Sequence, residues 1–290
     1  MKHRFQWFTY LAAGGLMVIS LESALAQPAP KLAPEPTAPV MTQRTKTASA
    51  NFTKHFKDLG IEGSIVIYDL NRDRTYEHNA NRNAQPFPPA STFKILNSLI
   101  ALETGAVDNE LALLTWDGVE RTLPGWNRDL NMQTAFKLSA VWFYQVLARR
   151  IGHERMHEWV AKVGYGNQAI GSADKIDTFW LDGDLRITPQ QQIQFLRRLQ
   201  RNELPFSEKV VSTVKAIMIM EQTPSYTIRA KTGWHGFGDP KKAQIGWYVG
   251  YVEQADNVYF FATNIDIRNE NDSKARAEVT RRCLKTLKLL

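Results

Sequence analysis

The chain has 290 residues, of which 43% are hydrophobic and 22% are charged. This composition supplies enough apolar side chains for a buried core, so it excludes a disordered or fibrous protein and favours one domain of ordinary size or a domain with two lobes. The net charge of +7 comes mostly from scattered basic residues, which argues against a nucleic-acid partner and gives only a weak bias toward anionic substrates.

The N-terminal segment has the features of a secretory signal peptide. Lys2 and Arg4 precede a mostly apolar run over residues 7–21, and Ala24-Leu25-Ala26 supplies small residues where a signal peptidase cleaves. We therefore predict a signal peptide over residues 1–26 and export to the periplasm. An uncleaved anchor is the alternative, but the apolar run is shorter than a membrane span usually needs. No later segment is long and apolar enough to span, so we expect no membrane association after cleavage.

A proline-rich stretch follows the predicted cleavage site. Its prolines block helices and strand ladders, which predicts a flexible leader over residues 27–49: Pro28, Pro30, Pro34, Pro36 and Pro39. We expect one folded catalytic domain over residues 50–290. Its one cysteine, Cys283, cannot form an intramolecular disulfide. Cys283 continues an apolar series in a predicted C-terminal helix with Ala275, Val279 and Leu287, so we interpret it as a buried structural thiol.

Runs of β-branched and aromatic residues lie near both ends of this domain, with a helical middle between them. The N-terminal run covers residues 63–70 and resumes at Thr75-Tyr76, which predicts a hairpin. Three later runs complete the set, namely Tyr226–Lys231, Gln244–Glu253 and Val258–Asp266. The order predicts an α+β fold, in which an antiparallel sheet is built from both chain ends, with flanking helices and a helical lobe.

The helical middle contains four clear apolar periodicities, over residues 91–103, 139–151, 153–163 and 189–201. The last of them has a distinct start signal. Thr188 is the predicted N-cap, Pro189 takes the first helical position, and Gln191 completes a capping box.

The first chemically suggestive motif is Ser91-Thr92-Phe93-Lys94, which follows a pair of prolines. Ser91 would lie in the first turn of a helix, with Lys94 one turn later on the same face, so hydroxyl and amine can meet. An amine in an apolar setting has a lowered pKa and can take the proton of a serine nucleophile. By itself the motif is equally compatible with a helix N-cap and a surface lysine.

Context favours this motif over two others of the same form. Ser172-Ala173-Asp174-Lys175 lies in a polar stretch, and Ser212-Thr213-Val214-Lys215 lies inside a helical run. Only the motif at Ser91 opens a helix after a proline pair, so we choose Ser91 as the candidate nucleophile.

A second motif, Lys231-Thr232-Gly233-Trp234, ends a strand that the pattern places on an edge of the sheet. Lys231 and Thr232 offer a cation and a hydroxyl for a substrate carboxylate, and Gly233 would let a substrate approach closely. The N–H groups of Ser91 and Trp234 could form an oxyanion hole. The alternative is a plain strand that ends in a glycine turn.

Two weaker motifs lie between the first two. Ser139-Ala140-Val141 begins a predicted helix, where Ser139 could pass a proton to a leaving nitrogen or simply serve as an N-cap. Tyr165-Gly166-Asn167 follows the next helix and by itself would be an ordinary loop turn.

In this order and spacing, the four motifs resemble those of the class D serine β-lactamases, the oxacillinase type. Phe179-Trp180-Leu181-Asp182-Gly183 resembles the family's loop beside the active site. Asn264-Ile265-Asp266 followed by Arg276 resembles its last strand and its carboxylate-binding arginine. The resemblance covers residues 51–290 and implies the fold shared by serine β-lactamases and penicillin-binding transpeptidases.

The resemblance also implies a mechanism. β-Lactams would be the substrates, and Lys94 would be carbamylated by CO₂ or bicarbonate, with no separate cofactor, to give a general base. Phe93, Val141 and Trp180 are the apolar candidates to line the lysine pocket, and the Trp180 N–H could donate to the carbamate. Substrate-binding residues would be Val141, Lys231, Thr232, Gly233, Trp234 and Arg276.

Three other interpretations remain open on the sequence. A penicillin-binding transpeptidase or carboxypeptidase shares the motifs, but Val141 replaces its usual polar Asn; a β-lactam sensor would need a membrane region. A non-enzymatic binding protein is disfavoured because every catalytic role has a candidate residue.

The histidines carry no predicted catalytic or metal-binding role. His235 lacks an acidic partner, so we place it on the rim, and no histidine spacing indicates zinc. We expect a monomer or a homodimer.

Overall fold

The computed structural model describes residues 51–290. The predicted signal peptide and leader, residues 1–26 and 27–49, lie outside the described residues. The helices are α1 (Thr53–Asp58), α2 (Ala80–Asn83), α3 (Lys94–Glu103), α4 (Met132–Leu138), α5 (Val141–Ile151), α6 (His153–Val163), α7 (Pro189–Gln200), α8 (Glu208–Ile217) and α9 (Glu270–Thr286). The strands are β1 (Gly63–Asp69), β2 (Arg74–His78), β3 (Ile219–Gln222), β4 (Thr227–His235), β5 (Ile245–Gln254) and β6 (Asn257–Asp266).

The six strands form one antiparallel sheet in the order β2-β1-β6-β5-β4-β3. Strand β1, from the start of the domain, pairs with β6, near its end, in the register Gly63↔Ile265 to Asp69↔Tyr259. The sheet is therefore complete only when both ends of the domain come together. This confirms the predicted α+β fold with a sheet built from both chain ends.

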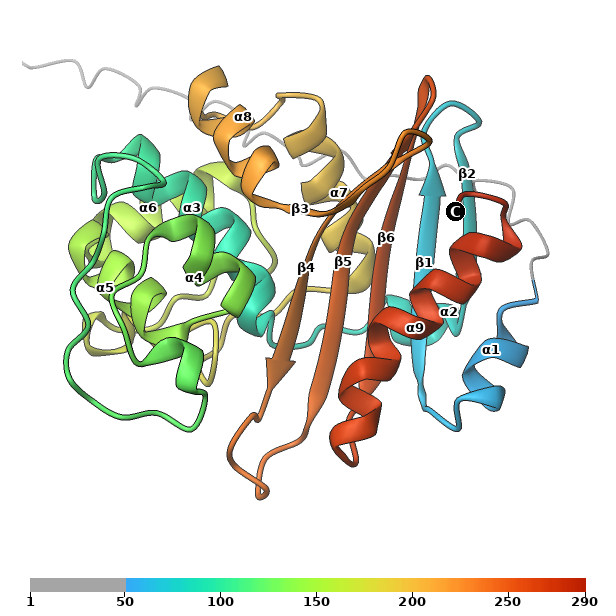
Figure 1. Cartoon of the computed structure of the whole chain (residues 1–290), viewed down its shortest axis with the longest axis horizontal. Helices are drawn as coiled ribbons and strands as arrows, with labels where there is room; N and C mark the ends of the chain where they lie inside the picture. The colour runs from blue at the N-terminus through green and yellow to red at the C-terminus, as the bar shows by residue number, and fades with distance from the viewer. Residues whose placement is uncertain (1–50) are drawn as a thin grey trace, which may run out of the picture. The chain divides into compact units, whose positions relative to one another are not determined.

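Both faces of the sheet are covered (Figure 1). Alternate residues of β1 point to opposite faces, as the two-residue period of a strand requires. Ile65 and Ile67 join a core with α1 and α9, whereas Val66 and Tyr68 join the larger core shared with the helical lobe. Helix α7 packs against β1, β5 and β6 on the face opposite α9. Burial on both sides explains why β1, β5 and β6 are continuous apolar runs instead of alternating ones.

The helical lobe is organised around α3, which is buried from Lys94 to Ala101 and packs against α5 and α8. Helix α7 begins as predicted: the Thr188 hydroxyl accepts from the backbone N–H of Gln191, and the Gln191 side-chain oxygen accepts from the backbone N–H of Thr188.

Cys283 is fully buried in α9, and burial raises the pKa of its thiol to about 12, in agreement with a structural role. Within residues 51–290, no helix is long and apolar enough to cross a membrane.

Three of the predicted elements that surround the site differ from the structure in their bounds. The first helix opens as a 3₁₀ turn, η1 (Ala90–Phe93), and becomes α-helical at Lys94. The predicted helix from Ser139 begins instead at Val141, after a separate helix, α4, that the sequence did not reveal. The strand expected to end at Lys231 continues as β4 through Gly233 to His235, because pairing with β5 extends along its whole length.

Candidate active site

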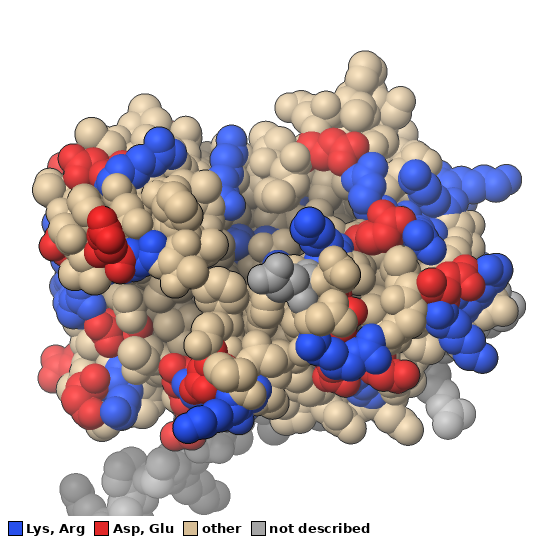
Figure 2. Space-filling model, turned by 60° about the horizontal axis from the view of Figure 1, so that its bottom comes forward, with Lys and Arg blue, Asp and Glu red and all other residues tan. Residues whose placement is uncertain are grey.

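A cleft of about 360 Å³ is lined by residues of the helical lobe on one side and by the end of β4 with its following loop on the other. Ser91 lies in its lining, 8% exposed, together with Ser139, Thr232 and Arg276. The described part of the molecule is hollowed between its two halves, and basic side chains lie within the hollow (Figure 2). The cleft therefore combines a serine hydroxyl with cations that suit an anionic ligand.

Ser91 and Lys94 meet as the sequence predicted. The Lys94 Nζ atom donates a hydrogen bond to Ser91 Oγ over 2.7 Å, although the two residues lie in η1 and at the start of α3. Lys94 is fully buried, and loss of hydration lowers the pKa of its amine from 10.5 to about 7. Near neutral pH this lysine is therefore partly uncharged, as both a proton acceptor and a CO₂-binding amine require.

Trp180 leaves an unused hydrogen-bond donor in this buried region. Its ring is fully buried and stacks on Phe93, with ring centroids 5.5 Å apart and an interplanar angle of 23°. Its Nε1–H is buried and has no hydrogen-bond partner. Since an unpaired buried donor is unfavourable, this N–H marks a place where an additional acceptor fits. The Lys94 amine also lies 5.3 Å from the ring centre of Tyr144, a neighbour that the sequence did not suggest.

Ser139 occupies a corner between two helices and is not the helix N-cap of the alternative interpretation. It follows α4 with left-handed backbone angles of φ 56° and ψ 33°, and α5 begins two residues later. Lys231 Nζ donates to Ser139 Oγ over 3.0 Å and to the backbone oxygen of Thr232 over 2.9 Å. Lys231 is 3% exposed, so it reaches the cleft through Ser139 and Thr232, which line it.

Arg276 of α9 completes a group of three basic side chains. Its guanidinium donates to the backbone oxygen of Gly233 over 2.7 Å, and burial lowers its pKa to about 10. Burial, and then the charges of Lys94 and Arg276, lower the pKa of Lys231. Among the side chains that the structure describes, which leave out Glu270, no ion pair gives Lys94, Lys231 or Arg276 an acidic partner. A bound anion would therefore stabilise the protonated forms of these basic groups.

Gly233 has a role in packing that the sequence did not indicate. A Cβ atom at this position would lie 3.1 Å from the Thr92 side chain and 3.2 Å from the backbone oxygen of Pro89. The glycine thus allows β4 to pack closely against the turn that carries Ser91, in addition to lining the cleft. The adjacent Trp234 also lines the cleft, and its indole N–H donates to Gln244 Oε1 over 2.8 Å.

The Tyr165-Gly166-Asn167 motif lies behind the site and braces it. Tyr165 is 1% exposed, and its hydroxyl accepts from Gln192 Nε2 over 3.4 Å; the same amide nitrogen donates to Thr92 Oγ1 over 2.9 Å. Asn167 hydrogen-bonds the backbone of Asp184 and Arg186. The motif therefore fixes the Ser91 turn and the segment after Trp180, and Gln192 is a member of this network that the sequence analysis missed.

Two further residues singled out in the sequence, Val141 and His235, also line the cleft. Val141 lies at the start of α5. His235 lies on the cleft wall, and its Nδ1–H donates to the backbone oxygen of Leu181 over 2.8 Å. The two rejected Ser-x-x-Lys motifs lie elsewhere: Lys175 pairs with the exposed Asp174, and Lys215 donates to Gln200 and Asn202. Among residues 51–290, no acidic, histidine or cysteine side chains gather into a metal-binding group.

Sequence comparison places the chain among proteins with named activities. Residues 41–285 match the family model of the penicillin binding protein transpeptidase domain. The chain is 43% identical over 248 residues to the β-lactamase OXA-48 of Klebsiella pneumoniae, which covers 86% of this chain and 90% of that one. It is 41% identical over 216 residues to the probable β-lactamase YbxI of Bacillus subtilis, covering 74% and 78% of the two chains.

Comparison of structures gives the same result. The class D β-lactamase YbXI from Nostoc has 60% sequence identity and a TM-score of 0.81, with 83% of this chain and 100% of that chain covered. The class D β-lactamase FUS-1 (OXA-85) of Fusobacterium nucleatum has 39% identity and a TM-score of 0.78, with 82% and 98% covered. These similarities extend over nearly the whole of the related chains.

Proposed function

Because this chain belongs to the class D β-lactamases, within the penicillin binding protein transpeptidase family, we propose that it hydrolyses β-lactam antibiotics through an acyl-enzyme on Ser91. The observation that carries this proposal is the buried Lys94 amine, 2.7 Å from Ser91 Oγ. The unpaired N–H of Trp180, whose ring stacks on Phe93 next to Lys94 in the chain, supports it. A nucleophile, its base and a place for an additional acceptor are thus present together.

In acylation, Ser91 Oγ attacks the carbonyl carbon of the β-lactam ring and gives its proton to the Lys94 side chain. The new ester C–O bond forms as the ring C–N bond breaks, and the ring nitrogen takes a proton from Ser139 Oγ. Lys231, which donates to Ser139 Oγ, favours that transfer, because a nearby cation lowers the pKa of a hydroxyl. Arg276 and Thr232, which line the cleft, would bind the substrate carboxylate, and the N–H groups of Ser91 and Trp234 would bind the developing oxyanion.

Carbamylation of Lys94 belongs to the same proposal. When CO₂ is joined to the lysine nitrogen, with loss of one proton, the side chain supplies a carboxylate-like general base near neutral pH. The Trp180 N–H would donate to it, which accounts for an otherwise unpaired buried donor. The added negative charge would also offset the cations at Lys231 and Arg276.

Before deacylation, the proton that the Lys94 side chain took from Ser91 passes to Ser139 Oγ, so both groups return to their starting state. In deacylation, the Lys94 side chain takes a proton from a water molecule, and that water attacks the ester carbon. The ester C–O bond breaks, Ser91 Oγ takes that proton from the Lys94 side chain, and the ring-opened product leaves. A single buried base thus serves both halves of the reaction. Export to the periplasm by residues 1–26 would bring the enzyme to its substrates before they reach their targets, and would confer resistance on the cell.

Turnover of a penicillin and of a chromogenic cephalosporin by the purified protein, compared with Ser91→Ala, tests the function. We expect catalytic hydrolysis by the parent and loss of at least about 10³-fold with Ser91→Ala. Mass spectrometry of quenched reactions should show one substrate added to Ser91. Stoichiometric acylation without turnover would instead indicate a penicillin-binding or sensor protein, and no acylation would exclude the proposal.

A further inference from the structure

Trp126 contacts both helices that meet at Ser139. It ends a short 3₁₀ turn, η2 (Pro124–Trp126), in the long loop before α4, and it lines the cleft. Its indole Nε1–H donates to the backbone oxygen of Leu138 over 3.0 Å. Leu138 is the last residue of α4, and the last carbonyls of a helix have no partner within the helix. The indole therefore caps α4 immediately before Ser139.

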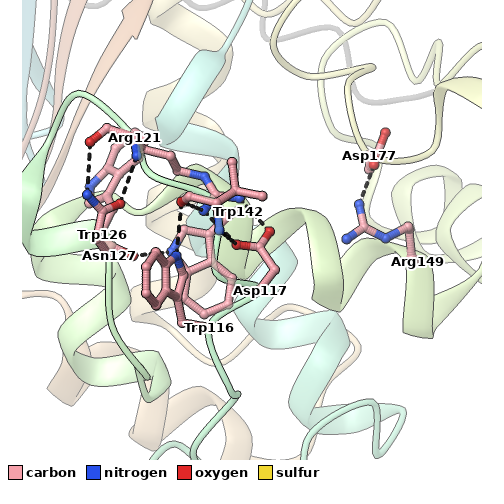
Figure 3. A network of polar contacts seen from close by, with 9 residues as sticks. Trp116, Asp117, Arg121, Trp126, Asn127, Trp142, Arg149 and Asp177 are labelled. Carbon is pink, nitrogen blue, oxygen red and sulfur yellow. Dashed lines mark hydrogen bonds and ion pairs between the residues drawn. The ribbon is translucent and has the colours of Figure 1, made fainter.

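The backbone of Trp126 is tied to the second of these helices. Its carbonyl oxygen accepts from the indole Nε1–H of Trp142 over 2.8 Å, and Trp142 lies in the first turn of α5. One residue thus joins the end of α4 to the start of α5. Ser139 lies between these two attachments, and Figure 3 shows Trp126 and Trp142 within one polar network.

The loop that carries Trp126 is itself braced. Asp117 accepts two hydrogen bonds from the guanidinium of Arg121, at 2.8 and 2.6 Å, and that guanidinium lies 5.7 Å from the ring centre of Trp142. Asn127 exchanges hydrogen bonds with the backbone of Arg121 in both directions, at 2.9 and 3.0 Å. Trp126 therefore acts from a fixed support.

Ser139 needs such a support because its backbone lies in the left-handed region, at φ 56°. Residues other than glycine adopt this conformation only when surrounding contacts hold it. A change at the corner would move Ser139 Oγ away from Lys231 Nζ, which lies 3.0 Å from it, and away from the ring nitrogen of a bound β-lactam.

We propose that Trp126 is a positioning residue for acylation, which holds the α4–α5 corner so that Ser139 can protonate the leaving nitrogen. This rests on the proposed function. Ser139 delivers a proton when the ring C–N bond breaks, whereas deacylation uses Lys94 and water. Loss of the indole N–H should therefore slow acylation selectively.

The test is Trp126→Phe, which keeps an aromatic wall and removes the N–H, studied by single-turnover kinetics with a penicillin. We expect the acylation rate at saturating substrate to fall about tenfold or more, with the deacylation rate of the preformed acyl-enzyme unchanged. The matched control is Trp116→Phe in the same loop. It removes an indole N–H that donates to Val119, away from Ser139, and should leave both rates as in the parent.

Trp142→Phe, which removes the attachment to α5, should give the same selective loss and provides the test if Trp126→Phe does not fold. An unchanged acylation rate in a folded Trp126→Phe protein, or an equal loss in both steps, would overturn the proposal. A change confined to the half-saturating substrate concentration would assign Trp126 to the cleft wall alone and also overturn it. Absence of hydrolysis by the parent protein would count against the proposed function instead.

Discussion

Lys94 combines complete burial with a hydrogen bond to the hydroxyl of Ser91, and burial alone moves the pKa of its amine from 10.5 to about 7. The uncharged amine is the form that binds CO₂, so protonation at low pH competes with carbamylation. Below a pH of about 7 the amine becomes charged and activity should fall, whereas above it the amine is already free.

This makes the pH dependence of carbamylation a specific prediction. The apparent dissociation constant for dissolved CO₂, measured from recovery of activity after degassing, should increase as pH falls because carbamylation releases a proton. Above a pH of about 7, the logarithm of this dissociation constant should increase by about one unit for each unit that the pH falls. Below a pH of about 7, it should increase by about two, since the amine must also lose a proton before it binds CO₂. A plot without a break between pH 5.5 and 8.5 would contradict the assignment of a lowered pKa to Lys94.

Trp180 provides a second prediction at a single atom. Trp180→Phe keeps a ring to stack on Phe93 but removes the unpaired Nε1–H. We expect weaker carbamylation and a deacylation rate lower by about tenfold or more, so that the acyl-enzyme accumulates. The uncarbamylated Lys94 amine, 2.7 Å from Ser91 Oγ, can still accept the Ser91 proton, whereas activation of water in deacylation depends on the carbamate. Intact-protein mass spectrometry during turnover measures this accumulation. Parental hydrolysis by Trp180→Phe without added bicarbonate would argue against the role.

Among the elements, the turn after α6 shows how a motif supports the site without lining the cleft. Gly166 has a φ of +57°, and a Cβ atom there would lie 2.1 Å from the backbone oxygen of Arg186. Gly164, two residues earlier, has a similar φ of +67° but open space around its Cβ position. The two glycines separate the effect of backbone conformation from that of close packing.

We therefore expect Gly164→Ala to reduce the free energy of unfolding by about 1 kcal/mol, the usual effect of a left-handed alanine. Gly166→Ala should reduce it by at least about 2–3 kcal/mol, since the clash adds to the same conformational cost. Urea denaturation of the two variants compares them directly. Equal losses of unfolding free energy would mean that the close approach of Gly166 to the backbone of Arg186 adds no cost.

The elements also show what the sequence could and could not predict. Helix periodicity, the capping box at Thr188 and the order of the motifs are local signals, and they led to the fold and to the Ser91–Lys94 contact. The left-handed corner at Ser139 lies between α4 and α5, beside a Trp126–Leu138 bond that spans 12 residues, and no sequence pattern signals such a corner, so its serine resembled a helix start. The bond between Gln192 and Thr92, 100 residues apart in sequence, likewise has no local signal.

At the scale of the whole domain, two hydrophobic cores lie on opposite faces of one sheet and share its strands. Strands β1, β5 and β6 each contribute alternate residues to both cores, so loss of one face removes support from the other. Cys283 lies in the core beneath α9, fully buried with its thiol pKa raised to about 12, whereas Ser91 lies on the opposite side of the sheet among the residues of the helical lobe. One cooperative unfolding transition is the expected consequence.

Thiol labelling tests this cooperativity. In urea, the midpoint for modification of Cys283 should coincide with the midpoint for loss of hydrolytic activity. The thiol should react negligibly before it, because it is both buried and protonated. Labelling of Cys283 at urea concentrations that leave full activity would show that α9 separates from the sheet independently.

The central claim, a β-lactamase whose base is a carbamylated Lys94, is tested most directly by bicarbonate titration of steady-state penicillin hydrolysis after degassing at mildly acidic pH. We predict that the degassed enzyme has little activity, that bicarbonate restores it saturably, and that Lys94→Ala, lower by about 10²–10⁴-fold, does not respond. Full activity without bicarbonate, or parental turnover by Lys94→Ala, would contradict the account.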